Sequence, residues 1–267
     1  MKAANLTVTI PYAGCDKNCP YCVSQITGHV ESNLELMKRN LVKVKTLCQA
    51  AGVTTVLLTS KGEPMLNIED LLFFMRAFSD WPLELQTNGK RLIKNLEALK
   101  IFAIEGLNTI AVSIDNEEDM INYPLIFIEA QKFGLTTRAT INITTAFNDW
   151  DIKRFVHWAQ ANNVDQVLLR NITVPNGAPV SEVTCWIRRN TNQEHWDYLQ
   201  NELKIIGIQP VATTTFGYKI YDIHGVGFVA NDYCIQDAHN FEDIRSLIFQ
   251  EDGHVYTSWM AAGSRLF

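Results

Sequence analysis

The sequence predicts an α/β protein, with parallel strands alternating with helices, followed by a C-terminal α+β extension. Through the first 175 residues, short runs rich in β-branched residues alternate with longer amphipathic segments. This alternation implies parallel strand pairing through right-handed crossovers. A stretch rich in Pro, Asn and Gly at 174–179 then interrupts the pattern. We therefore expect a core domain over residues 1–175 and an extension over residues 176–267 that covers the mouth of the core.

The predicted elements of the core begin and end at recognisable signals. Gly52 ends the first long helix as a C-cap, and the segment 67–70 caps the next helix at its N-terminus. Strand periodicity leaves open whether the sheet is open and doubly wound or closes into a barrel. In both cases functional side chains collect where the strands end. The predicted strands are 6–10, 54–59, 83–87, 109–114, 136–144 and 166–170, and the predicted helices are 32–51, 67–79, 92–101, 125–133 and 150–162.

The extension differs in character from the core. One helix is predicted over 193–206, and strand-like runs follow at 208–216, 218–223 and 226–230. The last two runs, 245–249 and 254–259, flank Glu251-Asp252-Gly253, which is a strong signal for a hairpin turn.

Composition excludes several classes of protein. The chain has 267 residues, of which 47% are hydrophobic and 19% charged, as in an ordinary globular protein. The net charge is −6 and Lys/Arg blocks are absent, so a large nucleic-acid partner is not expected, although a nucleotide-sized ligand is not excluded. No apolar run is long enough to cross a bilayer, so a membrane partner is not expected. The polar first residues do not resemble a signal peptide, and we expect a cytoplasmic protein.

Three cysteines occur within eight residues near the N-terminus. Cys15, Cys19 and Cys22 have the spacing C-x3-C-x2-C, and thiolates this close repel one another unless a cation holds them. Thiolates suit zinc, copper(I) and iron–sulfur clusters. Structural zinc takes four protein ligands, and no second pair follows here. A [4Fe-4S] cluster held by three thiolates has one iron open to a small molecule, whereas a three-thiolate zinc site and a disulfide remain the alternatives.

The loop after the second strand carries candidate binding groups. Gly62-Glu63-Pro64 follows the second strand, and the glycine permits a close backbone approach while the proline fixes the loop. Glu63 presents a carboxylate suited to holding an ammonium group. A simple helix-entry loop is the alternative interpretation.

Later strands carry polar side chains that share one face. Ser113 and Asp115 alternate at the end of the fourth strand, and Arg138, Thr140 and Asn142 alternate along the fifth. Polar groups on an inner face need partners, which either a bound polar ligand or a hydrogen-bond network in the core would supply. The sixth strand leads into two further polar residues, Arg170 and Asn171.

The cysteine motif after the first strand and Gly62-Glu63-Pro64 after the second resemble the radical S-adenosylmethionine (SAM) superfamily, in a member with a single cluster. Tyr21, before the third cysteine, fits the aromatic residue common in that family. The resemblance covers about the first 175 residues, and the cysteine motif is its specific part. It implies a partial (β/α)6 barrel for the core.

The resemblance also implies a role for each matching residue. Cys15, Cys19 and Cys22 would bind three irons of a [4Fe-4S] cluster, and the amino and carboxylate groups of SAM would chelate the fourth. Gly62 and Glu63 would hold the methionine amino group. The other predicted cofactor contacts are Tyr21 near the adenine, Pro64 in the Glu63 loop, Ser113 or Asp115 at the ribose, Arg138 at the methionine carboxylate, Asn142 on the same strand, and Arg170 at the adenine edge.

The activity implied is reductive cleavage of SAM to a 5′-deoxyadenosyl radical that abstracts hydrogen from a small-molecule or nucleotide-like substrate. A flavodoxin- or ferredoxin-type protein would donate the electron. Arg188 and Arg189, with Arg170 and Lys61, are candidates for binding an anionic substrate. Two alternative hypotheses for the function are a radical SAM enzyme that modifies a peptide, and a non-catalytic electron-transfer or zinc protein.

The remaining cysteines do not complete another metal site. Cys48 and Cys185 stand alone, and Cys234 is the only cysteine beyond position 200, so a second cluster is not expected. The peptide-modifying interpretation relies on a second cluster, so it is weakened. Cys234 is a candidate catalytic residue that would return a hydrogen atom to a substrate radical, as in some epimerases of the superfamily.

Overall fold

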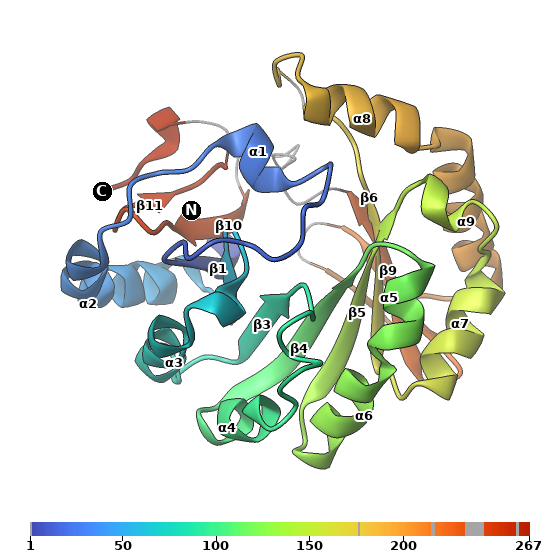
Figure 1. Cartoon of the computed structure of the whole chain (residues 1–267), viewed down its shortest axis with the longest axis horizontal. Coiled ribbons are helices and arrows are strands. Elements are labelled where there is room, and N and C mark those ends of the chain that lie inside the picture. Colours follow the sequence, from blue (N-terminus) through green and yellow to red (C-terminus); the bar gives the residue numbers. More distant parts are fainter. Residues whose placement is uncertain (1, 176, 215–216, 233–242, 260–261) are drawn as a thin grey trace.

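A single curved sheet forms the centre of the protein (Figure 1). The computed structural model describes residues 2–175, 177–214, 217–232, 243–259 and 262–267. Within them, eleven strands lie in the order β11-β10-β1-β2-β3-β4-β5-β6-β9-β8-β7. The strands are β1 (Lys2–Ile10), β2 (Thr55–Ser60), β3 (Leu83–Thr87), β4 (Leu107–Ile114), β5 (Thr136–Ile143), β6 (Gln166–Asn171), β7 (Ala212–Thr213), β8 (Lys219–Ile223), β9 (Val226–Asp232), β10 (Asp243–Phe249) and β11 (Val255–Tyr256).

The six strands of the core are parallel and adjacent in chain order. The predicted α/β class is therefore confirmed, and the sheet curves without closing on itself (Figure 1). Among the described residues, six helices lie outside the curve (Figure 1): α2 (Leu34–Ala51), α3 (Ile68–Ala77), α4 (Ala98–Ile104), α6 (Pro124–Lys132), α7 (Ile152–Ala161) and α9 (Gln193–Ile206). Helices α1 (Val23–Thr27) and α8 (Glu182–Asn190) lie at its open side and contact each other, and α5 (Glu117–Asn122) follows β4.

The extension continues the same sheet at both of its edges. Strand β9 pairs in parallel with β6, and β10 pairs in parallel with β1. The predicted hairpin is confirmed, because β10 pairs antiparallel with β11, with Phe249 opposite Val255. Residues near both ends of the chain therefore lie side by side at one edge of the sheet.

Two predicted elements differ from the structure, and helix α8 was not predicted. The helix expected over 92–101 begins only at Ala98, because Gly89 has a φ of 81° and the chain continues in turns. Of the strand expected over 208–216, the described residues 208–214 form a strand only at β7, and Ile208, at the start of the range, has a φ of 52°, outside the strand region. Ser181 and Thr184 nevertheless form a capping box at the start of α8.

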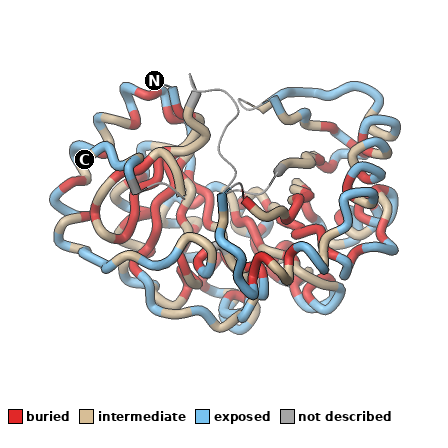
Figure 2. The backbone as a smooth tube through the Cα atoms, turned by 90° about the horizontal axis from the view of Figure 1, so that it is seen from above, coloured by how far each residue is buried: buried red, intermediate tan, exposed pale blue. Residues whose placement is uncertain are grey.

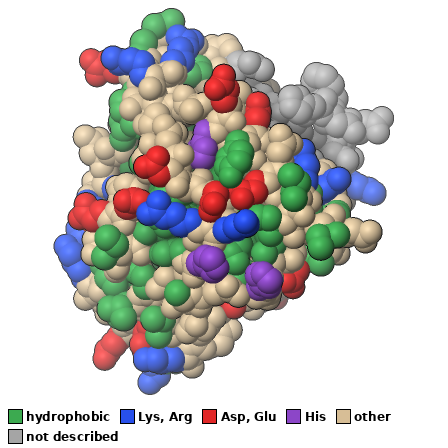
Figure 3. Space-filling view, turned by 90° about the vertical axis from the view of Figure 1, so that its right-hand side faces the viewer, with side chains coloured by type: hydrophobic (Ala, Val, Ile, Leu, Met, Phe, Trp, Pro, Cys, Tyr) green, Lys and Arg blue, Asp and Glu red, His purple; other side chains and the backbone are tan. Residues whose placement is uncertain are grey.

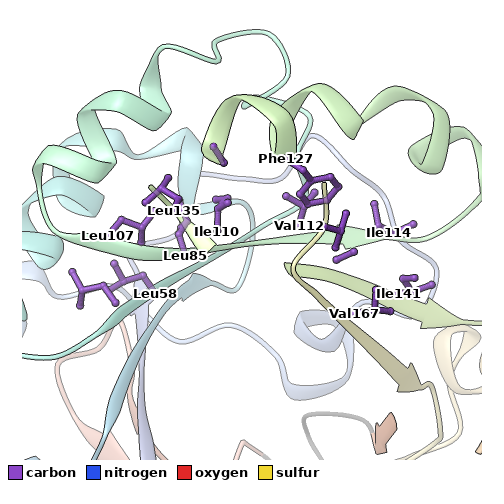
Figure 4. Packing of buried hydrophobic residues seen from close by; sticks show 14 of the residues in the cluster. Leu58, Leu85, Leu107, Ile110, Val112, Ile114, Phe127, Leu135, Ile141 and Val167 are labelled. Carbon is purple, nitrogen blue, oxygen red and sulfur yellow. The ribbon is translucent and has the colours of Figure 1, made fainter. Parts of the chain in front are cut away.

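The hydrophobic core lies between the sheet and the outer helices. Figure 4 shows Val112 of β4 beside Phe127 of α6, with Leu58 and Leu85 of the neighbouring strands further along the same layer, and all four side chains are fully buried. Alternate residues of each strand supply this layer, which leaves the other face of the strands for the interior of the curve. Figure 2 shows the buried backbone concentrated along the sheet, with exposed residues mainly on the surrounding helices and loops.

The outer surface carries mixed side chains. On the face shown in Figure 3, acidic, basic and hydrophobic groups are interspersed, and its described residues form no extended basic area. No helix among the described residues has the length and apolar character required to span a membrane.

Candidate active site

The inner face of the curved sheet encloses a cavity of about 640 Å³. Every core strand contributes polar side chains to its wall, and the three N-terminal cysteines lie at the same cavity. This size is within the range of about 300–1,000 Å³ that small-molecule sites occupy. The predicted site residues on its wall are Cys15, Cys19, Cys22, Tyr21, Gly62, Glu63, Ser113, Asp115, Arg138, Asn142 and Arg170.

The cysteine loop follows β1 and ends in a turn, in which the Cys22 N–H donates to the Cys19 carbonyl at 3.1 Å. Cys15 is exposed, and Cys19 and Cys22 are partly buried. Among the described residues, no group of three Cys, His, Asp or Glu side chains converges on a single metal ion. In a [4Fe-4S] cluster each thiolate binds a different iron, and the three thiols on one cavity wall would supply ligands for three of them.

Without a bound metal, the environment of Cys15 and Cys19 favours their neutral thiol forms. Burial raises the pKa of Cys15, and burial together with the charge of Asp115 raises the pKa of Cys19. Metal ligation requires thiolates, so cluster binding would displace these protons.

Lys17, between the first two cysteines, anchors the loop to β4. Its ammonium nitrogen lies 2.5 Å from Oδ2 of Asp115 and 2.7 Å from Oδ2 of Asp119. Burial alone would lower the pKa of Lys17, but the two carboxylates raise it overall, so the lysine is charged. Sequence reasoning missed this residue, because its partners are about a hundred positions away in the chain.

Asp115 is the centre of a hydrogen-bond network. It accepts from the hydroxyl of Tyr21 and from Nδ2 of Asn142, the latter at 2.6 Å. The thiol of Cys19 lies 3.7 Å from its other oxygen. The structure therefore brings together Tyr21, Asp115 and Asn142, which were predicted separately from the cysteine motif and from two different strands. Oδ1 of Asn142 is buried and has no hydrogen-bond partner, so it is an acceptor available to a ligand.

Gly62 and Glu63 form a tightly packed corner. A Cβ on Gly62 would lie 2.0 Å from the carbonyl oxygen of Gly14, so only glycine fits there. The Glu63 N–H donates to the same carbonyl at 3.0 Å. Pro64 follows as the first residue of a short 3-10 helix and does not line the cavity described here.

Glu63 is 2% exposed, and its carboxylate accepts three hydrogen bonds from the described part of the protein. It accepts from the Thr87 hydroxyl at 2.6 Å, from the Asn88 N–H at 2.8 Å and from the Met65 N–H at 3.1 Å. Burial nevertheless raises its pKa above the ordinary range. A buried carboxylate with this tendency gains from a cationic partner, which an ammonium group of a ligand would supply.

Arg138 is held by side chains of two other strands. Its Nη1 forms an ion pair with Glu84 on β3, and its Nε and Nη2 donate to Oε1 of Gln166 on β6 at 2.8 and 2.6 Å. Arg170 lies nearer the ends of the strands, and its buried Nε has no hydrogen-bond partner.

The predicted substrate-binding residues differ in their positions. Arg188 and Arg189 are exposed on α8 and do not line the cavity. Lys61 does line it, is 5% exposed, and packs its ammonium group 6.0 Å from the centre of the Trp259 ring. Cys234 lies outside the described residues.

Comparison with known proteins identifies the fold. No family model matches the chain. The 7-carboxy-7-deazaguanine synthase of Clostridium acetobutylicum is 24% identical in sequence, over 64% of this chain and 86% of the relative. SuiB of Streptococcus suis, in a crystal structure with its precursor peptide SuiA, superposes with a TM-score of 0.63 and 14% identity over 96% of this chain. These proteins are radical SAM enzymes. The resemblance to the radical SAM superfamily is confirmed.

Further radical SAM structures agree with this fold. The protein anSMEcpe, with bound AdoMet, superposes with a TM-score of 0.61 and 12% identity, over 99% of this chain and 77% of that one. The sheet of this protein therefore corresponds to the partial barrel of radical SAM enzymes, as predicted. The chain spans only 59% of the length of SuiB.

Proposed function

We propose that this protein is a radical SAM enzyme that binds a [4Fe-4S] cluster through Cys15, Cys19 and Cys22. The observation that supports this most strongly is that the three cysteines share one cavity with the buried Glu63 carboxylate and with Asp115. When bound, the cluster would supply one electron to SAM and so generate the 5′-deoxyadenosyl radical that abstracts hydrogen from substrate.

The residues of the chain would bind and orient SAM. The carboxylate of Glu63 would accept from the methionine ammonium group, a charge-assisted bond that also offsets its burial. Asp115, or Ser113 beside it, would accept from the ribose hydroxyls, and Tyr21 would lie near the adenine. The unpartnered atoms of Asn142 and Arg170 would complete the polar contacts. Enclosure by the curved sheet would exclude water from the reacting groups.

The substrate is proposed to be a small molecule. The relative from Clostridium is named for a small carboxylated product, and this chain covers most of its length. SuiB and anSMEcpe have been solved with peptides, so a peptide substrate is the second candidate. The cavity holds SAM as well as substrate in this proposal, which favours a compact substrate.

Anaerobic reconstitution with iron and sulfide tests the proposed function. We expect about four irons per chain in a brown protein, and 5′-deoxyadenosine from SAM after addition of dithionite. Ala variants of Cys15, Cys19 and Cys22 should each lose most of the iron, whereas Cys185→Ala, on α8, should retain it. A colourless protein that holds zinc and leaves SAM intact would overturn the proposal.

Three other expectations remain predictions. They are a flavodoxin- or ferredoxin-type electron donor, a cytoplasmic location, and a hydrogen-donating role for Cys234.

A further inference from the structure

Arg138 lies deep in the cavity, away from the cysteine loop. It precedes Asn142 by four residues on β5, which at about 3.3 Å per residue places its Cα about 13 Å further from the ends of the strands. Its partner Glu84 likewise precedes Thr87, the residue that contacts Glu63, by three positions on β3. Both partners of Arg138 therefore hold its guanidinium in the lower half of the cavity.

The guanidinium of Arg138 is held in place, but the hydrogen bonds that hold it do not use all of its N–H donors. Arginine has five N–H donors, and three bonds to Glu84 and Gln166 use one on each nitrogen. One N–H on each of Nη1 and Nη2 is left without a partner among the described residues. The side chain is 27% exposed, against 5% for Glu84, so the uncommitted part of the guanidinium faces open space rather than the core. Such a preorganised pair of donors suits an oxyanion.

Other groups on the wall reinforce this preference. Basic side chains there are Lys17, Lys61, Arg138, Arg170 and Arg245, and acidic ones are Glu63, Glu84 and Asp115. The described wall thus has five basic and three acidic side chains, although the whole chain has a net charge of −6. The wall therefore favours a ligand with an anionic group.

We propose that Arg138, held by Glu84 and Gln166, binds a carboxylate of the substrate at the bottom of the cavity, opposite the cysteine loop. In this proposal Arg138 binds the substrate, and not the methionine carboxylate of SAM as expected from the sequence. The inference rests on the proposed function in placing the substrate below SAM, and it narrows the substrate class to small carboxylates.

Paired probes of equal shape test the proposal. Nicotinate and nicotinamide differ in one group, a carboxylate against a neutral amide. Titration calorimetry with the cluster-reconstituted protein and SAM, without reductant, should show nicotinate binding about tenfold more tightly, the usual weight of a charge-assisted hydrogen bond. Equal binding of the two probes, or no binding of nicotinate, would overturn the proposal.

The test variant is Glu84→Gln/Arg138→Gln, because replacing Arg138 alone would leave a buried carboxylate without a partner. The double variant should lose the preference for nicotinate while its SAM affinity stays within about twofold of wild type. The control Arg188→Gln, an exposed arginine on α8, should keep the preference. A preference that persists in the double variant contradicts the proposal.

Two outcomes separate this inference from the proposed function. If the double variant loses SAM affinity and keeps the nicotinate preference, Arg138 belongs to the SAM site and the inference fails alone. If wild-type protein does not bind SAM, the proposed function fails, and the nicotinate preference still decides whether Arg138 is a carboxylate site.

Discussion

The ammonium nitrogen of Lys17 lies 2.5 Å from the Asp115 carboxylate, so the loop that carries the three cysteines is tied to the end of β4. A second carboxylate, Asp119, holds the same nitrogen at 2.7 Å. Both side chains of the first pair are about nine-tenths buried. The position of the loop therefore depends on an ion pair within the protein and not only on the metal that it is proposed to bind.

Lys17→Met should destabilise the protein and reduce cluster uptake. The substitution keeps the apolar length of the side chain but leaves two carboxylates without their cation. Breaking a buried pair in this way costs about 3–5 kcal/mol. Urea unfolding of the metal-free protein measures the free energy of unfolding, and iron content after reconstitution measures uptake. Lys38→Met, which removes an exposed i,i+3 pair with Glu35, should change the free energy by less than about 0.5 kcal/mol. Equal effects of the two substitutions would contradict an anchoring role.

Gly62→Ala should displace the corner that presents Glu63. The added methyl group would meet the backbone carbonyl of Gly14, which cannot move as a flexible side chain can. Overpacking of this kind costs about 1–3 kcal/mol. Gly263→Ala is the matched control, since nothing lies within 4 Å of its Cβ position. A crystal structure of the variant with an unchanged 62–64 backbone would refute the expected displacement.

The stability of the metal-free protein should depend on the ionisation of Glu63. Burial raises the pKa of this carboxyl in the folded state, so the folded protein binds its proton more tightly than the unfolded chain. The contribution of Glu63 to stability therefore falls as pH rises from about 4.5, its ordinary pKa, through the raised value. Urea unfolding between pH 4 and 8 should show Glu63→Gln gaining stability relative to wild type as pH increases. A difference that is constant with pH would show that Glu63 titrates normally.

Tyr21→Phe should cost about 1 kcal/mol, the net value of one hydrogen bond. The ring would still pack against Trp186, whose centre lies 5.4 Å away, but the Asp115 carboxylate would lose one donor. Tyr21→Leu removes the ring as well and should cost more. Thermal unfolding of both variants measures the two contributions. If Tyr21→Phe is neutral, the hydroxyl does not support Asp115 in the metal-free protein.

Local patterns predicted the core strands, because each is a short apolar run between turn signals, and the structure confirms their order. The cysteine spacing and the Gly62 corner were also visible, since each lies within a few consecutive residues. The pairing of Arg138 with Glu84 was not, because the two are 54 positions apart and the alternation along β5 shows a polar face without naming its partners. Lys17 was missed for the same reason.

The parallel pairing of β10 with β1 has a consequence for how the protein is made. The hydroxyl of Thr9 donates to the carbonyl of Phe249, 240 positions later. Until that late segment leaves the ribosome, β1 has a neighbour on one side only, and contacts of such long sequence separation form slowly. The cysteine loop extends directly from β1. We therefore expect the cysteine loop to reach its final position only after residues 243–249 have been synthesised, so that cluster insertion follows the pairing of β10 with β1.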